Sequence, residues 1–133
     1  MAAEKMNARE QAFVIVFEKS FNDDVSFEEL IEFSSGCENL NVGEKATKMI
    51  YGVRDNFESI DETIEKHLLN WKKDRISKVA LAALRIGVYE LTVSKGAPVG
   101  VIISECVNIC GKYGSDEDKS FVNGLLGSVA RDI

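Results

Sequence analysis

Apolar residues recur at helical spacing along nearly the whole sequence, and no stretch sustains the period of two that half-buried strands show. The clearest stripe runs from Val99 to Cys110, with apolar residues at i, i+3, i+4, i+7, i+8 and i+11, which cover one face of a helix. Pro98 stands just before this stripe, where its missing N–H costs nothing. The periodicity therefore predicts an all-α protein.

Local start and stop signals divide the sequence into helices. Three serine–acid pairs have the spacing of a capping box: Ser26 with Glu29, Ser59 with Glu62, and Ser115 with Asp118. Gly36, Gly96 and Gly114 follow apolar stretches as predicted helix ends, and we expect Gly114 to adopt the left-handed conformation. These signals predict about seven helices, at residues 7–20, 26–35, 43–58, 60–72, 77–94, 98–113 and 117–131.

The segment 79–91 is apolar on most sides, so we expect it to be a central helix surrounded by others. Its small residues, among them Gly87, would allow a neighbouring helix to approach closely. Arg85 is informative in this segment, because a buried guanidinium needs a carboxylate or carbonyl partner. Glu105 and Glu90 are both candidate partners, and the sequence does not choose between them.

The chain of 133 residues suits one domain, and no linker or low-complexity tract divides it. We expect two packed helical subdomains, an N-terminal one at about 1–75 and a C-terminal one at about 76–133. No run of 18 apolar residues exists, and the N-terminus lacks the apolar core of a signal peptide. These features predict a cytoplasmic protein with no membrane association.

The net charge of −6 at first argues against binding to nucleic acid. The charge is uneven, however, because residues 23–44 hold seven acids and no base, and the rest of the chain sums to +1. The acidity of one segment therefore excludes nothing at the two ends of the chain. The segment itself is either a solvated face or a docking site for a basic partner.

The sequence contains few patterns that are typical of catalytic, phosphate-binding or metal sites. His67 is the single histidine and has no motif around it, and neither phosphate-binding glycine pattern occurs. Cys106 and Cys110 stand one helical turn apart, so a metal or thiol site is conceivable, but they also lie on the apolar stripe and no further Cys/His pair completes a zinc site. We therefore expect no enzyme and no metal.

The start of the last predicted helix combines polar residues with Phe121, Asn123 and Gly124. A glycine inside a helix costs about 1 kcal/mol relative to alanine, so Gly124 needs a packing or functional reason. In one interpretation Gly124 allows a close helix contact and Phe121 belongs to the core. In the other, Phe121 beside Lys119 forms a stacking platform for an unpaired base.

Four segments together resemble the NusB family of bacterial transcription antitermination factors: Phe121-Val122-Asn123-Gly124-Leu125-Leu126, Ala83 to Leu91 (ALRIGVYEL), Ile103 to Val107 (ISECV), and Ala8 to Ala12 (AREQA). The resemblance covers nearly the whole chain. It implies an all-α fold of two helical bundles, no catalytic cofactor, and a role in ribosomal RNA transcription. In that role the protein would bind single-stranded boxA-like RNA together with NusE, a small-subunit ribosomal protein, within the transcription elongation complex.

The resemblance also implies site residues, carried over by position. The RNA-binding set has Lys5 and Arg9 for phosphates, Lys119 for phosphates or base edges, and Phe17 and Phe121 for stacking. The NusE-binding set lies between residues 68 and 80 and comprises Leu68, Trp71, Asp74 and Ala80.

Two positions differ from the pattern common in the family. Lys5-Met6-Asn7 stands where a run of arginines is usual, and Ala80 stands where an acid is frequent. Fewer phosphate contacts predict weak RNA binding by the chain alone and stronger binding with NusE. The alternative that the sequence leaves open is a helical adaptor that binds only protein, through its acidic segment.

Overall fold

The computed structural model describes residues 6–34, 42–68 and 75–133. These residues contain no strand and form seven α-helices: α1 (Ala8–Lys19), α2 (Phe27–Ser34), α3 (Glu44–Asp55), α4 (Phe57–Lys66), α5 (Lys78–Tyr89), α6 (Val99–Tyr113) and α7 (Asp116–Asp132). A π-helical segment, η2 (Glu90–Ser94), continues α5. The prediction of an all-α fold is confirmed. None of the described helices has the length and apolar character needed to span a bilayer.

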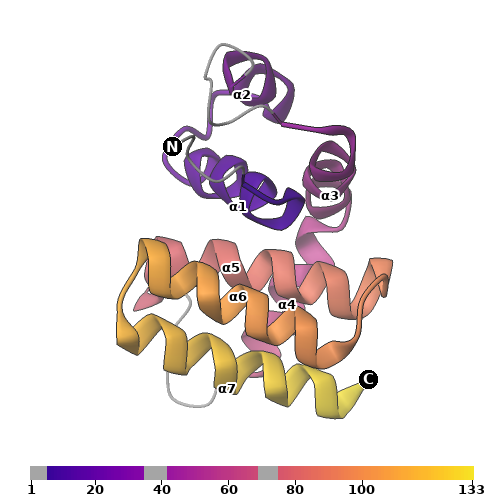
Figure 1. The fold of residues 1–133 in the computed structure, drawn as a ribbon, viewed down its shortest axis with the longest axis vertical. Helices are drawn as coiled ribbons and strands as arrows, with labels where there is room; N and C mark the ends of the chain where they lie inside the picture. Colours follow the sequence, from indigo (N-terminus) through magenta and orange to yellow (C-terminus); the bar gives the residue numbers. More distant parts are fainter. Residues whose placement is uncertain (1–5, 35–41, 69–74) are drawn as a thin grey trace, which may run out of the picture.

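The helices form two layers (Figure 1). The first contains α1, α2 and α3, and in the second α5, α6 and α7 lie side by side. Helix α4 leads from the first layer to the second and packs against α5. The division into subdomains at about residue 75 stays a prediction.

Helix α5 lies at the centre, as the sequence predicts. Nearly every residue from Ala80 to Leu91 is buried, and the neighbours come from α1, α3, α4, α6 and α7. Because helices surround α5 on all sides, it needs no polar face.

The prediction that Glu105 or Glu90 pairs with Arg85 is wrong. Both of its candidate partners lie elsewhere, and the guanidinium instead forms two hydrogen bonds of 2.9 Å with the carboxylate of Asp61 on α4. The Arg85 guanidinium carbon also lies 4.4 Å from the ring centroid of Phe57. Asp61 sits in a polar stretch of sequence, so nothing local marks it as a buried residue until α4 packs on α5.

The capping predictions hold at two of three sites. Ser115 and Asp118 form a full capping box, and the Ser26 hydroxyl oxygen accepts a hydrogen bond from the Glu29 backbone N–H. The prediction at Ser59 is wrong: α4 begins at Phe57, and the Ser59 hydroxyl donates to the carbonyl of Asn56. Helix α4 also ends at Lys66 rather than at residue 72.

The predicted helix ends need correction as well. Gly114 has φ −128°, which is outside the left-handed region, and the left-handed residue at the end of η2 is Lys95, at φ 49°, rather than Gly96. Gly114 is required for space instead, because a Cβ there would lie 2.4 Å from Oδ2 of Asp118. Gly36 lies outside the described residues.

Helix glycines differ in their surroundings. A Cβ on Gly52 of α3 would lie 2.2 Å from the ring of Tyr89, and one on Gly87 would lie 2.7 Å from a methyl group of Leu126. A Cβ on Gly124 of α7 would meet nothing within 4 Å. The close-contact interpretation of Gly124 is therefore wrong, and its reason has to be sought at the surface.

We expect Asp61→Ala to lower the free energy of unfolding by about 3 to 5 kcal/mol, because it leaves the Arg85 charge buried without a partner. Urea denaturation measures this loss. The control is Asp55→Ala, which removes an exposed carboxylate that pairs with Arg54 and should cost less than about 1 kcal/mol. Equal losses in the two variants would contradict the assignment.

We expect Gly124→Ala to raise the free energy of unfolding by about 1 kcal/mol, because alanine is the better helix former and the site is open. Gly52→Ala should lower it by about 1 kcal/mol or more, because the rigid Tyr89 ring has to move. Both are read from urea midpoints. A destabilised Gly124→Ala would show that its side-chain position is occupied after all.

Candidate functional site

The starts of α5 and α7 are joined by one carboxylate. Asp118 accepts a hydrogen bond from the Ser115 backbone N–H (3.0 Å) through Oδ2 and from the Ser77 hydroxyl (2.7 Å) through Oδ1. The Ser77 oxygen in turn accepts from the Ala80 N–H at 3.0 Å and caps α5. Two helix N-termini are therefore held together, and both present partial positive charge at the same corner.

A pocket of about 250 Å³ opens at this junction. Its walls are Arg75, Ile76, Ser77, Ala80, Glu117, Asp118 and Phe121. Phe121, predicted to bind RNA, and Ala80, predicted to bind the partner, therefore line one pocket although they are 41 positions apart in the sequence. Within the described part of the chain, no carboxylate lies within ion-pair distance of the exposed Arg75.

Lys119 lies beside this junction and is not part of the pocket wall. Its side chain passes over Gly111 of α6, where a Cβ would lie 3.3 Å from Cδ of Lys119. No carboxylate among the described residues lies within ion-pair distance of its ammonium group. Lys119 therefore carries a charge that a ligand could neutralise.

Arg9 is held inside the protein. Its guanidinium makes two hydrogen bonds, of 2.5 and 2.7 Å, to the buried carboxylate of Glu90, and Glu105 lies 3.9 Å away. The hydrogen bond with Glu90 raises the pKa of Arg9, and partial burial opposes that rise. Because the Arg9 side chain is only 15% exposed, it fixes α1 against the end of α5 and presents little free charge.

Glu10, the next residue along α1, also forms its side-chain hydrogen bonds within the protein. Glu10 accepts hydrogen bonds from the Lys112 ammonium (2.8 Å) and the Tyr113 hydroxyl (3.1 Å) at the end of α6. Burial of Tyr113 and the nearby Glu10 carboxylate both raise the pKa of the Tyr113 hydroxyl. Helix α1 is thus attached to α6 as well as to α5.

Phe17 belongs to a row of aromatic side chains along α1. Its ring stacks on Phe13 with centroids 5.7 Å apart and meets Phe21 edge-on at 5.1 Å. Phe13 lies 5.1 Å from Tyr113. Phe17 is half-buried in this row, whereas Phe21 at its end is 58% exposed.

The remaining predicted partner residues are only partly placed. Leu68 is half-buried just after the end of α4, and Ala80 is buried on α5. Lys5, Trp71 and Asp74 lie outside the described residues. The structure adds Arg75, Ser77 and Asp118 to the junction, and only the capping pattern at Ser115 and Asp118 hinted at them in the sequence.

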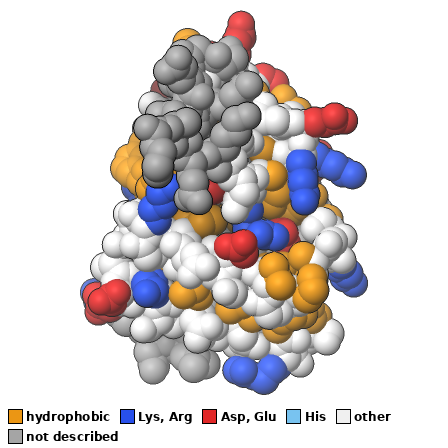
Figure 2. Space-filling view, in the orientation of Figure 1, with side chains coloured by type: hydrophobic (Ala, Val, Ile, Leu, Met, Phe, Trp, Pro, Cys, Tyr) orange, Lys and Arg blue, Asp and Glu red, His pale blue; other side chains and the backbone are white. Residues whose placement is uncertain are grey.

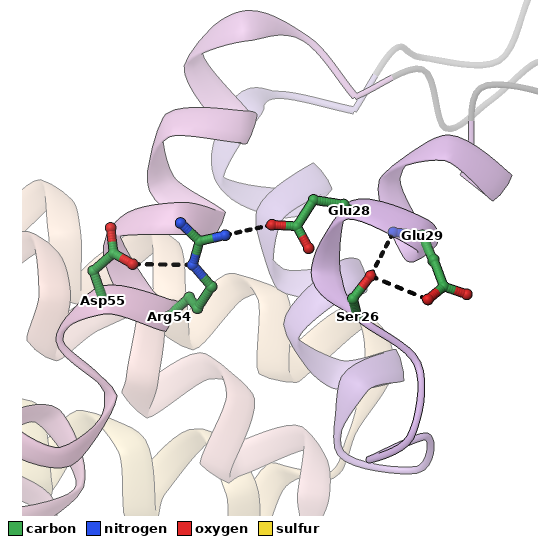
Figure 3. Close-up of polar contacts among 5 residues, drawn as sticks. All are labelled: Ser26, Glu28, Glu29, Arg54 and Asp55. Atoms are coloured by element: carbon green, nitrogen blue, oxygen red, sulfur yellow. Dashed lines mark hydrogen bonds and ion pairs between the residues drawn. The ribbon is translucent and has the colours of Figure 1, made fainter.

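The acidic segment is partly neutralised within the protein (Figure 3). Glu28 of α2 pairs with Arg54 of α3 at 2.5 Å, and Arg54 also binds Asp55 at 3.0 Å. Ser26 and Glu29 cap the start of α2. Two of the acids considered for partner docking therefore have a structural role in holding and capping α2. On the face in Figure 2, acidic and basic side chains are interspersed.

The other titratable candidates also have structural surroundings. Burial raises the pKa of the Cys110 thiol to about 12 and that of Cys106 further, so neither is a thiolate at neutral pH. The His67 ring nitrogens face the Thr63 carbonyl oxygen at 2.9 Å and the Asp132 carboxylate at 2.6 Å. Among the described residues, no three His, Cys, Asp or Glu side chains are grouped to hold a metal ion.

Comparison with known proteins gives one consistent result. The NusB family model matches residues 6–131. The transcription antitermination protein NusB of Bacillus licheniformis is 34% identical over 129 residues, covering 97% of this chain and 98% of the relative. NusB of Clostridium botulinum is 38% identical over 128 residues, covering 93% and 96%.

Comparison with solved structures also identifies NusB proteins. T. maritima NusB has a TM-score of 0.83 and 30% identity, covering 97% of this chain and 94% of that one. A chain from the crystal structure of antitermination factors NusB and NusE in complex with dsRNA has a TM-score of 0.81 and 30% identity, with 95% coverage of both chains. Sequence, fold and coverage together show that the chain belongs to the NusB family.

Proposed function

We propose that this protein is a transcription antitermination factor of the NusB type, which binds single-stranded boxA-like RNA together with NusE during ribosomal RNA transcription. It acts as an adaptor in the transcription elongation complex and has no chemistry of its own. Such a role implies a cytoplasmic protein. Family membership over residues 6–131 supports the proposal. The related structure of NusB and NusE in complex with dsRNA supports binding to NusE and to RNA.

The observation that carries the proposal is the pocket between the starts of α5 and α7. Phe121 supplies an aromatic surface in its wall, and Arg75 supplies a cation with no carboxylate partner among the described residues. The wall also holds the carboxylates of Glu117 and Asp118, which offset the positive ends of the two helices. Unpaired bases stack on aromatic side chains while phosphates are held by cations and helix N-termini. The pocket therefore suits one nucleotide of a single strand.

The open space at Gly124 fits the same role. Gly124 is exposed on α7, one turn after the pocket residue Phe121, and a side chain there would touch nothing within the described protein. Gly124 weakens the helix, and internal packing does not require it. A ligand that approaches the backbone closely at this turn would explain why glycine stands there. We infer that bound RNA or NusE passes over this turn.

Electrostatics support a composite mechanism. Arg9, Arg54, Arg85 and Lys112 are paired with carboxylates, so these four cations are engaged within the protein. Lys119 is available for a phosphate, and the proposed phosphate contact of Arg9 would compete with Glu90. A chain with a net charge of −6 binds RNA weakly by charge alone, so we infer that NusE supplies part of the affinity.

NusE is proposed to bind along Leu68, Trp71, Asp74 and Ala80. Ala80 also lines the pocket of Phe121, so the partner surface and the RNA surface would adjoin there. A strand of RNA at this corner would touch both proteins. Such adjacency converts two weak surfaces into one stronger composite site.

The direct test is a fluorescence-anisotropy titration of labelled boxA-like RNA with the protein alone and with saturating NusE. We expect weak binding alone and binding at least about tenfold tighter with NusE, which corresponds to about 1.4 kcal/mol. A scrambled RNA of the same length is the control. Equal affinity with and without NusE, or no preference over the scrambled RNA, would contradict the proposal.

Phe121→Leu tests the pocket itself. Leucine keeps an apolar side chain in place but removes the aromatic face, so RNA binding in the presence of NusE should weaken by about 1 to 3 kcal/mol. The matched control is Phe33→Leu, because Phe33 is 71% exposed on α2, away from the junction. If both variants bind RNA like the parent protein, Phe121 is not a stacking residue.

A further inference from the structure

A second aromatic and basic corner lies at the end of α1. Phe21 is 58% exposed, and the Lys78 ammonium lies 5.1 Å from its ring centroid. Lys78 also donates a hydrogen bond of 3.2 Å to the carbonyl of Ser20, which joins the end of α1 to the start of α5. A large aromatic ring is therefore kept at the surface beside a cation, where burial does not explain it.

The charge at this corner is available to a ligand. Lys19 donates to the carbonyls of Asp23 and Val25, both at 2.7 Å, and Lys78 to that of Ser20, so both ammonium groups contact neutral backbone oxygens. In the described part of the chain, neither has a carboxylate at ion-pair distance. The one acid in the wall of the adjoining pocket is Asp23. Two lysines against one acid leave a local surplus of positive charge.

The corner is also hollow. Lys19, Ser20 and Lys78 line a pocket of about 490 Å³, whose walls also include the aromatic rings of Phe27 and Phe57. This volume lies within the range of about 300 to 1,000 Å³ that small-ligand sites occupy. The pocket therefore has room for a nucleotide next to Lys19 and Lys78, while the exposed ring of Phe21 lies outside its wall.

This corner is continuous with the junction of α5 and α7. Lys78 follows directly after Ser77, which lines the Phe121 pocket, so the two pockets lie on either side of the start of α5. The aromatic row Phe21, Phe17, Phe13 and Tyr113 runs from this corner to the end of α6, next to the α7 cap.

We propose that the corner formed by Phe21, Lys78 and Lys19 is a second contact for single-stranded RNA, with one base on the Phe21 ring and the lysines on the adjacent phosphates. The inference rests on the proposed function and extends it. The strand leaving the Phe121 pocket crosses the start of α5 and reaches this corner. The stacking role that the family resemblance implied for Phe17 passes to Phe21, because Phe21 is the exposed ring of this aromatic row.

Phe21→Ala and Lys78→Gln separate stacking from charge. The probe is labelled single-stranded RNA that extends beyond the boxA-like element on both sides, titrated in the presence of NusE at several salt concentrations. Phe21→Ala should weaken binding by about 5- to 150-fold without changing the salt dependence. Lys78→Gln should reduce the slope of log K against log salt by about 0.7, the loss of one phosphate contact.

The controls are Phe33→Ala on α2 and Lys48→Gln on α3, which change an exposed ring and an exposed cation elsewhere and should leave RNA binding unchanged. Circular dichroism verifies that each variant is folded. If Phe21→Ala and Lys78→Gln behave like these controls while Phe121→Leu weakens binding, this inference is wrong and the proposed function stands.

Two other outcomes also overturn the inference. If the two variants lose binding to NusE in the absence of RNA, the corner docks a protein rather than RNA. If the parent protein with NusE binds no RNA, the proposed function fails and this extension fails with it.

Discussion

Helix α5 and its π-helical continuation η2 carry two charged side chains into the interior, and each is neutralised by a residue from a different helix. Arg85 binds Asp61 of α4, and Glu90 binds Arg9 of α1, in both cases through two hydrogen bonds. A buried charge without a partner is costly, so each pairing restricts how its helix can sit on α5. Arg9 in particular ties the first layer to the end of the central helix, and the position of α1 depends on it.

These pairings decide which charges remain for a ligand. Arg9, Arg85 and Lys112 are engaged with carboxylates, whereas Lys19, Arg75, Lys78 and Lys119 have no carboxylate partner among the described residues. Lys19, Arg75 and Lys78 line the two pockets on either side of the start of α5, and Lys119 lies beside the junction with α7. A protein with net charge −6 can therefore still present a local basic and aromatic surface.

The acidic stretch takes no part in this surface. Glu28 is paired with Arg54, and the Glu29 carboxylate accepts a hydrogen bond from the Ser26 hydroxyl that caps α2, so part of the acidity holds the first layer together (Figure 3). The remaining acids keep the chain's overall charge negative. This charge distribution favours an adaptor that requires a second protein to hold RNA tightly over one that binds RNA by charge alone.

Much of the fold follows from the sequence, because helical periodicity is a local property. The predicted helices at 98–113 and 117–131 match α6 and α7 within one residue at each end, and the buried centre at α5 is confirmed. Predictions that depend on contacts between residues far apart in the sequence were less accurate. Three features arise only when helices pack together: the pairing of Arg85 with Asp61, the π-helical end of α5 and the lack of space for a side chain at Gly114.

The candidate site shows the same limit. Phe121 was identifiable from its motif, but Arg75 and Ser77 were not, because they reach the start of α7 only through the packing of α5 on α7 and the shared carboxylate of Asp118. Phe17 was carried over by position from the family resemblance, and the structure shows that the exposed ring of this row is Phe21. Exposure and adjacency are properties of the fold, so the sequence alone cannot rank two aromatic residues on one helix.

The most direct test of this account is backbone NMR chemical-shift mapping of the protein with NusE, before and after adding boxA-like RNA. The account predicts that RNA-dependent shifts concentrate at the start of α5, the start of α7 and Phe21, while the exposed face of α2 and the start of α6 remain unchanged. Shifts confined to α2, or none on adding RNA, would contradict a basic and aromatic RNA surface centred on the start of α5.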